Sequence, residues 1–185
     1  MSFPAFIDTC ALYSATLTDT LLRIAEERAF RPHWSAGVMT ELASVLVREA
    51  GLKREQAARR IAQMQRAFPA AEVIEYEPLI EVMSCDQKDR HVLAAAVHGG
   101  CEVLVTFNLK DFPPESTEPF HVTVVSPDAF LLDQLDLYPA KVGRALLAQL
   151  TAAKRPPLTM GQLLGRLARA GVPGFAAETR RHEFA

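Results

Sequence analysis

The stretch Asp86-Gln-Lys-Asp-Arg-His-Val-Leu-Ala-Ala-Ala-Val97, closed by Gly99-Gly100, is followed at once by Cys101-Glu-Val-Leu-Val-Thr106. Its acidic opening and alanine-rich run predict a helix over residues 86–98, and the glycine pair is typical of a helix C-cap and turn. The apolar run that follows predicts a buried strand over 101–106. A helix leading directly into a buried strand indicates a parallel sheet, in which ligands bind at the carboxyl ends of the strands.

The same alternation of helix and strand extends on both sides of this stretch. Further strands are predicted over 3–7, 33–35, 71–76 and 121–126, and further helices over 17–30, 38–48, 53–68 and 127–135. This order predicts an α/β fold with a mostly parallel sheet, in which 71–76 is an edge strand. Beyond Pro139 there are helical patterns without a strand signal. We therefore predict a body over 1–136 and a small helical extension over 137–185.

Composition agrees with a folded protein of 185 residues, because 49% of them are hydrophobic and 23% are charged. No apolar run approaches the ~18 residues of a membrane-spanning helix, and the first residues lack the pattern of a signal peptide. We expect a cytoplasmic protein that does not contact a membrane. The three cysteines are scattered, which favours neither a zinc site nor a disulfide framework.

Charge is distributed unevenly along the chain. Residues 1–140 carry a net charge of −8, whereas residues 141–185 carry +6. The basic tail is interpreted either as ordinary solvated helix faces or as a surface for a polyanion or an acidic partner.

Carboxylates recur where the predicted strands end and the helices begin. Asp8 ends the first strand and Asp111 follows the strand that ends at Thr106. Acidic residues also open two helices, at Glu41 and at Asp86 and Asp89. Like charges gathered at one sheet edge oppose folding unless a cation neutralises them. Oxygen ligands without a Cys or His cluster favour Mg²⁺ or Mn²⁺, ions suited to phosphodiester hydrolysis.

Each of these residues also has an ordinary structural interpretation. Glu41 is predicted in the first turn of its helix, where it would complement the helix dipole. Asp86 is interpreted as the helix cap, and Asp89 as the site residue, because it shares the face of buried positions further along the helix. Asn108 and Asp111 would also suit an Asx-type turn. Arg90 and His91 are interpreted as residues of the helix surface, with Arg90 also a candidate for phosphate binding.

Four segments in the same order resemble the PIN-domain nucleases, and more narrowly the VapC-like toxins with a helical C-terminal extension. They are Phe6-Ile-Asp-Thr-Cys-Ala-Leu12, Thr40-Glu-Leu42, Asp86-x-x-Asp-Arg-His-Val-Leu-Ala-Ala-Ala96 and Val105-Thr-x-Asn-x-x-Asp-Phe112. The resemblance covers about residues 3–135. It implies a three-layer α/β/α sandwich.

The resemblance also implies a Mg²⁺- or Mn²⁺-dependent endoribonuclease. Its catalytic, metal-holding positions fall on Asp8, Glu41 and Asp89, and its fourth position falls on the segment with Asn108 and Asp111. Many members carry Asp where Asn108 stands, so Asp111 is assigned the charge and Asn108 a supporting role, together with Thr9, Asp86 and Thr106. The family further implies an RNA substrate, a homodimer and a cognate antitoxin protein.

Three other functions fit parts of the pattern. A PIN scaffold that binds RNA or a protein without cutting has the same residues. A phosphohydrolase with an Asp nucleophile would want a second Asp two residues after Asp8, where Cys10 stands. A receiver-like signalling domain would want an acidic pair and a late Lys, and neither is well placed.

Overall fold

The computed structural model describes residues 2–154 and 156–182, and its centre is a five-stranded sheet in the order β3-β2-β1-β4-β5. All four strand pairs are parallel. The strands are β1 (Phe3–Ile7), β2 (Phe30–Ser35), β3 (Glu72–Val73), β4 (Val103–Val105) and β5 (Thr123–Val125). The central position of β1 explains its sequence, because the apolar side chains of Ala5, Phe6 and Ile7 are completely buried.

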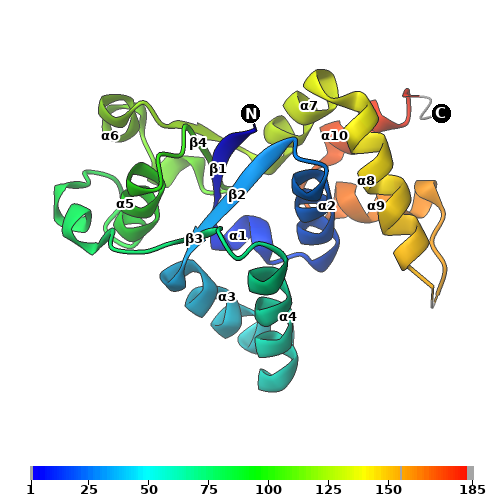
Figure 1. The fold of residues 1–185 in the computed structure, drawn as a ribbon, viewed down its shortest axis with the longest axis horizontal. Helices are drawn as coiled ribbons and strands as arrows, with labels where there is room; N and C mark the ends of the chain where they lie inside the picture. The colour runs from blue at the N-terminus through cyan, green and yellow to red at the C-terminus, as the bar shows by residue number, and fades with distance from the viewer. Residues whose placement is uncertain (1, 155, 183–185) are drawn as a thin grey trace.

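Helices cover both faces of this sheet. In Figure 1, α5 lies on one side of the strands and α2 on the other, with α8 outside α2. The helices are α1 (Thr9–Leu12), α2 (Ala15–Glu26), α3 (Ala36–Arg48), α4 (Arg54–Ala67), α5 (Arg90–His98), α6 (Pro114–Thr117), α7 (Pro127–Leu137), α8 (Pro139–Ala152), α9 (Met160–Arg169) and α10 (Pro173–Thr179). Short 3₁₀ turns lie at Glu77–Val82, Leu109–Asp111 and Glu118–Phe120. The predicted three-layer α/β/α fold with a helical extension is confirmed.

Two boundaries differ from the sequence prediction in ways that matter for the site. The helix predicted from residue 86 begins at Arg90, because Asp86 Oδ1 instead accepts a hydrogen bond from the Lys88 N–H in a preceding turn. The helix predicted from residue 38 begins at Ala36, with Ser35 as its cap. Glu41 therefore lies in the second turn of α3, and its interpretation as a first-turn charge is wrong.

Strand β2 is also longer than predicted, because it begins at Phe30 and contains Pro32. Proline lacks an N–H and is disfavoured within a sheet. Here β3 pairs only with Trp34 and Ser35, so the backbone of Pro32 has no strand partner on that side.

The C-terminal helices are docked on the body. The Gln149 side chain of α8 is buried against α2, where its Nε2 donates to the Thr16 carbonyl at 3.1 Å and its Oε1 accepts from Thr20 Oγ1 at 2.7 Å. A capping box of Thr159 and Gln162 begins α9. Helix α10 begins at Pro173, because proline is favoured at a first helical position. No helix in the described ranges has the length and apolar character to cross a membrane.

Asp128 ties α10 to α7. Its two carboxylate oxygens accept from the backbone N–H groups of Gly174 at 3.0 Å and Phe175 at 2.8 Å. Asp128→Ala removes both acceptors, so we expect a loss of about 1–2 kcal/mol in the free energy of unfolding. Urea denaturation checks this, with the exposed Asp133→Ala of the same helix as control. Equal unfolding midpoints for the two variants would show that these hydrogen bonds do not hold α10.

Candidate active site

Asp8 stands at the carboxyl end of the central strand with its carboxylate fixed in place. The residue is only 4% exposed. Its Oδ1 accepts from the Thr9 N–H at 2.6 Å, while its Oδ2 accepts from Thr106 Oγ1 at 2.7 Å and from the Cys10 thiol at 3.2 Å. Thr106 follows the neighbouring strand β4, so the parallel pairing of β1 and β4 brings these two residues together. The sequence prediction that both lie at one sheet edge is confirmed by this contact.

Glu41 is linked to the same edge through Thr9 and His91. Thr9 Oγ1 donates to Glu41 Oε2 at 2.9 Å, and Glu41 Oε1 lies 3.1 Å from His91 Nε2. The hydrogen bond with His91 lowers the pKa of Glu41 despite partial burial, and the same bond raises the pKa of His91. The charges of Asp8 and Asp89 raise the pKa of His91 further. Helices α3 and α5 are thus joined by a hydrogen-bonded pair at the edge where Asp8 lies.

Asp89 is the acidic residue of this edge whose pKa is raised most by its environment. Burial raises its pKa to about 6, and the negative charges of Asp8, Asp111 and Asp86 raise it as well, while His91 lowers it. It occupies the N-cap position of α5, but its side chain accepts no capping hydrogen bond. Its carboxylate therefore does not cap the helix.

Asp86 is not the helix cap that the sequence suggested. It lies in the turn before α5, and its backbone N–H donates to the Asp111 carbonyl at 3.0 Å. This bond holds the Asp86 turn against the 3₁₀ turn of Leu109–Asp111. Asn108 begins that turn without a side-chain cap, is exposed, and donates its backbone N–H to Thr106 Oγ1 at 3.0 Å. Arg90 opens α5 half-buried, and its Nε has no hydrogen-bond partner among the described residues.

The donor chemistry of this edge suits a hard divalent cation. Its acidic side chains offer carboxylate oxygens, and Asp8, Asp86, Asp89 and Asp111 form no ion pair within residues 2–154 and 156–182. Burial and the negative charges of Asp8, Asp111 and Asp86 raise the pKa of Asp89, and a nearby cation would oppose that rise. Within the same ranges, no three His, Cys, Asp or Glu side chains already stand in the arrangement of a metal site. A cation would therefore have to draw these carboxylates closer together.

Two residues of this edge were not recognised from the sequence. His91 was interpreted as a surface residue, yet its side chain is 20% exposed and pairs with Glu41, which lies fifty positions earlier in the chain. Cys10 bonds to Asp8 and lies 3.3 Å from Thr106 Oγ1, and burial and the charge of Asp8 raise its pKa to about 12. The thiol is thus a neutral donor. Its position two residues after a strand-ending Asp was the available signal.

Replacing His91 should reveal how much the Glu41–His91 pair contributes to the free energy of unfolding. The pair is charged only where Glu41 is ionised and His91 protonated. Folding lowers the pKa of Glu41, so its contribution to the free energy of unfolding is present above the unfolded-state pKa of 4.5. Folding raises the pKa of His91, so its contribution is present below the unfolded-state pKa of 6.5. We expect His91→Gln to cost about 0.5–1 kcal/mol near pH 5.5, because the pair is partly exposed. The difference from wild type should shrink at pH 8.5, and urea unfolding at both pH values checks it.

Comparisons with known proteins agree with this geometry. Residues 4–110 match the family model described as PIN domain, and residues 127–181 match the one described as VapC50 C-terminal domain. The protein named "Putative ribonuclease VapC50" of Mycobacterium tuberculosis is 47% identical to this chain over 106 residues. That match covers 57% of this chain and 62% of the relative. The PIN-domain model spans more than half of the sequence, and it includes Asp8, Glu41 and Asp89. The chain therefore belongs to the PIN-domain family.

Proposed function

We propose that this protein is an endoribonuclease that hydrolyses RNA with the help of Mg²⁺ or Mn²⁺. The observation that carries the proposal is the group of carboxyl side chains at the carboxyl edge of a parallel sheet, where burial and the charges of Asp8 and Asp111 raise the pKa of Asp89. Such an edge favours a bound cation and, through it, an anionic substrate. A PIN-domain relative named as a ribonuclease supports RNA as that substrate.

Each side chain of the edge has a part in this proposal. Asp8, Asp89, Asp111 and Glu41 hold the cation, which when bound polarises the phosphodiester and makes water more nucleophilic. Thr106 and Cys10 keep the Asp8 carboxylate in one orientation, and Thr9 does the same for Glu41. His91 holds Glu41 from the other side and partly offsets the negative charge. Arg90, Asp86 and Asn108 are proposed to support the phosphate-binding edge.

An RNA cleavage assay with the purified protein tests this function. A 5′-labelled single-stranded RNA is incubated with protein in Mg²⁺, in Mn²⁺ and in excess EDTA. We expect cleavage in both metals, none in EDTA, and products that end in 5′-phosphate and 3′-hydroxyl. Binding of RNA without cleavage in either metal would instead support a PIN scaffold that does not cut.

We further propose that the protein is the toxin of a toxin–antitoxin pair, acts in the cytoplasm and forms a homodimer. The match of residues 127–181 to the VapC50 C-terminal domain supports this role. Induced expression of the wild type should arrest bacterial growth, whereas expression of Asp8→Asn at the same level should not. Normal growth with abundant folded wild-type protein would contradict a toxin role. Sedimentation of the purified protein checks the dimer.

A further inference from the structure

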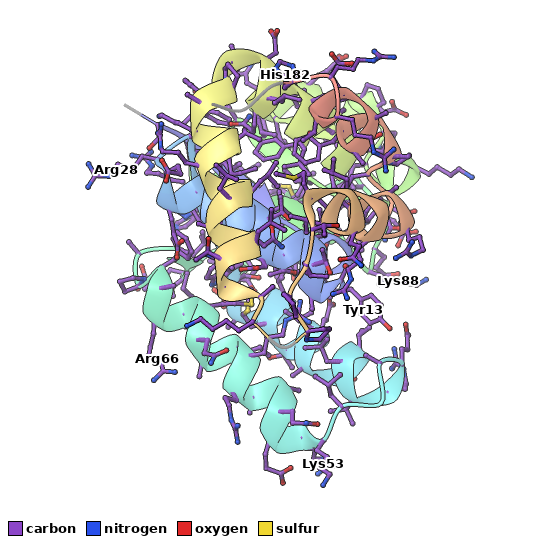
Figure 2. The ribbon with its side chains drawn as sticks, turned by 90° about the vertical axis from the view of Figure 1, so that its right-hand side faces the viewer. Tyr13, Arg28, Lys53, Arg66, Lys88 and His182 are labelled. Atoms are coloured by element: carbon purple, nitrogen blue, oxygen red, sulfur yellow. The ribbon has the colours of Figure 1, made fainter. Side chains whose placement is uncertain are left out.

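A cleft of about 650 Å³ lies between the body and the C-terminal extension. Its walls come from the turn between α1 and α2, the end of α3, the loop after β4, and helix α9. The residues used below are Cys10, Tyr13, Arg60, Phe107, Arg166 and Arg169. Figure 2 shows α9 crossing this face of the molecule, with Tyr13 beneath it in the view. The extension thus forms one wall of a cavity whose other walls belong to the PIN domain.

The cleft adjoins the carboxylate edge through two of its lining residues. Cys10 lines it, and the thiol of that residue donates to Asp8 Oδ2 at 3.2 Å. Phe107 lines it as well, and its backbone N–H donates to Cys10 Sγ at 3.2 Å. A chain molecule lying in this cleft would therefore contact Cys10, the residue whose thiol holds the Asp8 carboxylate.

The extension supplies positive charge to the cleft. Arg166 and Arg169 are exposed, and three-residue spacing places them on one face of α9. Neither forms an ion pair within the described ranges. Arg60 differs, because its guanidinium donates to the Leu12 carbonyl at 2.7 Å and to Thr18 Oγ1 at 2.9 Å. Arg60 therefore supports the α1–α2 turn, while the arginines of α9 remain available to an anion.

Aromatic rings stand beside these charges. Phe107 is 37% exposed, and its ring packs against Gly171 just after α9. A Cβ at Gly171 would lie 2.8 Å from Phe107 Cε1, and the residue has a φ of +97°, so glycine is needed for this contact. Tyr13 lines the same cleft from the α1–α2 turn. The extension thus fixes one aromatic ring at the cleft and leaves part of it exposed.

We propose that this cleft binds the single-stranded RNA that flanks the cleaved bond, with phosphates on Arg166 and Arg169 and bases on Phe107 and Tyr13. Exposed arginines next to aromatic rings are the combination by which proteins hold single-stranded nucleic acid without reading sequence. The rings, and the contact of the lining residue Cys10 with Asp8, favour RNA over an acidic protein segment. This inference rests on the proposed ribonuclease function, and it gives the C-terminal extension a role in substrate binding.

Salt-dependent RNA binding tests the inference. Binding of a labelled single-stranded RNA is measured from 50 to 300 mM KCl. The parent protein is full-length Asp8→Asn, which does not cleave the RNA. It is compared with the same protein that also carries Arg166→Gln and Arg169→Gln. Each lost phosphate contact on a single strand should flatten the slope of log K against log salt by about 0.7, so we expect a change of about 1.4. Phe107→Ala should weaken binding by roughly tenfold and leave the slope unchanged.

Two control variants separate charge at the cleft from charge in general. Arg180→Gln with Arg181→Gln removes the same charge from the extension outside the cleft and should leave the slope unchanged. Arg166→Lys with Arg169→Lys should restore the slope, because it restores the charge. A melting temperature close to that of the parent protein would show that each variant is folded.

The outcomes are distinguishable. If the wild type neither binds nor cleaves RNA, the proposed function is overturned, and this inference with it. If the wild type cleaves RNA but the Gln variants keep the parental slope, only the inference is overturned. Arginine-dependent binding of polyglutamate, with unchanged RNA binding, would overturn it in favour of an acidic protein partner.

Discussion

Asp8→Asn is expected to lower the rate of RNA cleavage in Mg²⁺ by more than about 100-fold. A drop of 10–100-fold is already usual when a group that merely supports a metal ligand is removed, and Asp8 is proposed as a ligand itself. The amide keeps the volume of the carboxylate and can still accept from Thr106 Oγ1, so the fold should be retained. Single-turnover cleavage of a labelled RNA measures the effect.

The matched control for Asp8→Asn is Asp136→Asn, which removes one negative charge from an exposed position of α7. It should cleave at the wild-type rate. Cleavage by Asp8→Asn within a few-fold of the wild type, with a normal unfolding midpoint, would remove Asp8 from the catalytic group.

Asp89→Asn is expected to abolish cleavage as well, but to stabilise the metal-free protein at neutral pH. The pKa of Asp89 is about 6 in the folded protein against an ordinary value of 3.8. The folded state thus holds this proton more tightly than the unfolded state, so its contribution to stability is present at low pH and is lost as pH rises through about 6. After allowance for partial exposure, we expect a gain of about 1 kcal/mol, or about 2–4 °C in Tm, at pH 8.

Thermal unfolding in EDTA at pH 5 and pH 8 checks the effect of Asp89→Asn. The gain over wild type should be present at pH 8 and smaller at pH 5, where the wild-type carboxyl group is itself protonated. Equal unfolding midpoints of the two proteins at pH 8 would show that the charges of Asp8 and Asp111 do not destabilise the ionised carboxylate of Asp89. Asp133→Asn, on the surface of α7, controls for a general effect of charge.

Much of the fold was predictable because its central strands have simple sequences. The buried run Phe3–Ile7 ends in Asp8, and Val103–Val105 ends before Thr106, so parallel pairing alone brings those two residues together. The alternation of strand and helix then gave the three-layer architecture. These features depend on hydrophobic patterns within a few residues of one another.

The contacts that complete the carboxylate edge could not be predicted from local hydrophobic patterns. The bond between Glu41 and His91 joins residues fifty positions apart, and nothing in either local sequence indicates the other. The start of α5 was misplaced because the Asp86 side chain accepts from the Lys88 N–H in a turn, which a helical pattern does not reveal. Helix α10 depends on Asp128, forty-seven positions before Phe175. Contacts between distant residues decided the Glu41–His91 pair and helix α10, and a local turn decided the start of α5.

Calorimetric titration of Mg²⁺ and Mn²⁺ into the metal-free protein at pH 7.5 measures whether these carboxylates bind a cation in the absence of any substrate. We expect saturable binding to the wild type and to Asp136→Asn, and loss of that binding in Asp8→Asn and in Asp89→Asn. No binding to the folded wild type, or equal binding to all four proteins, would contradict it.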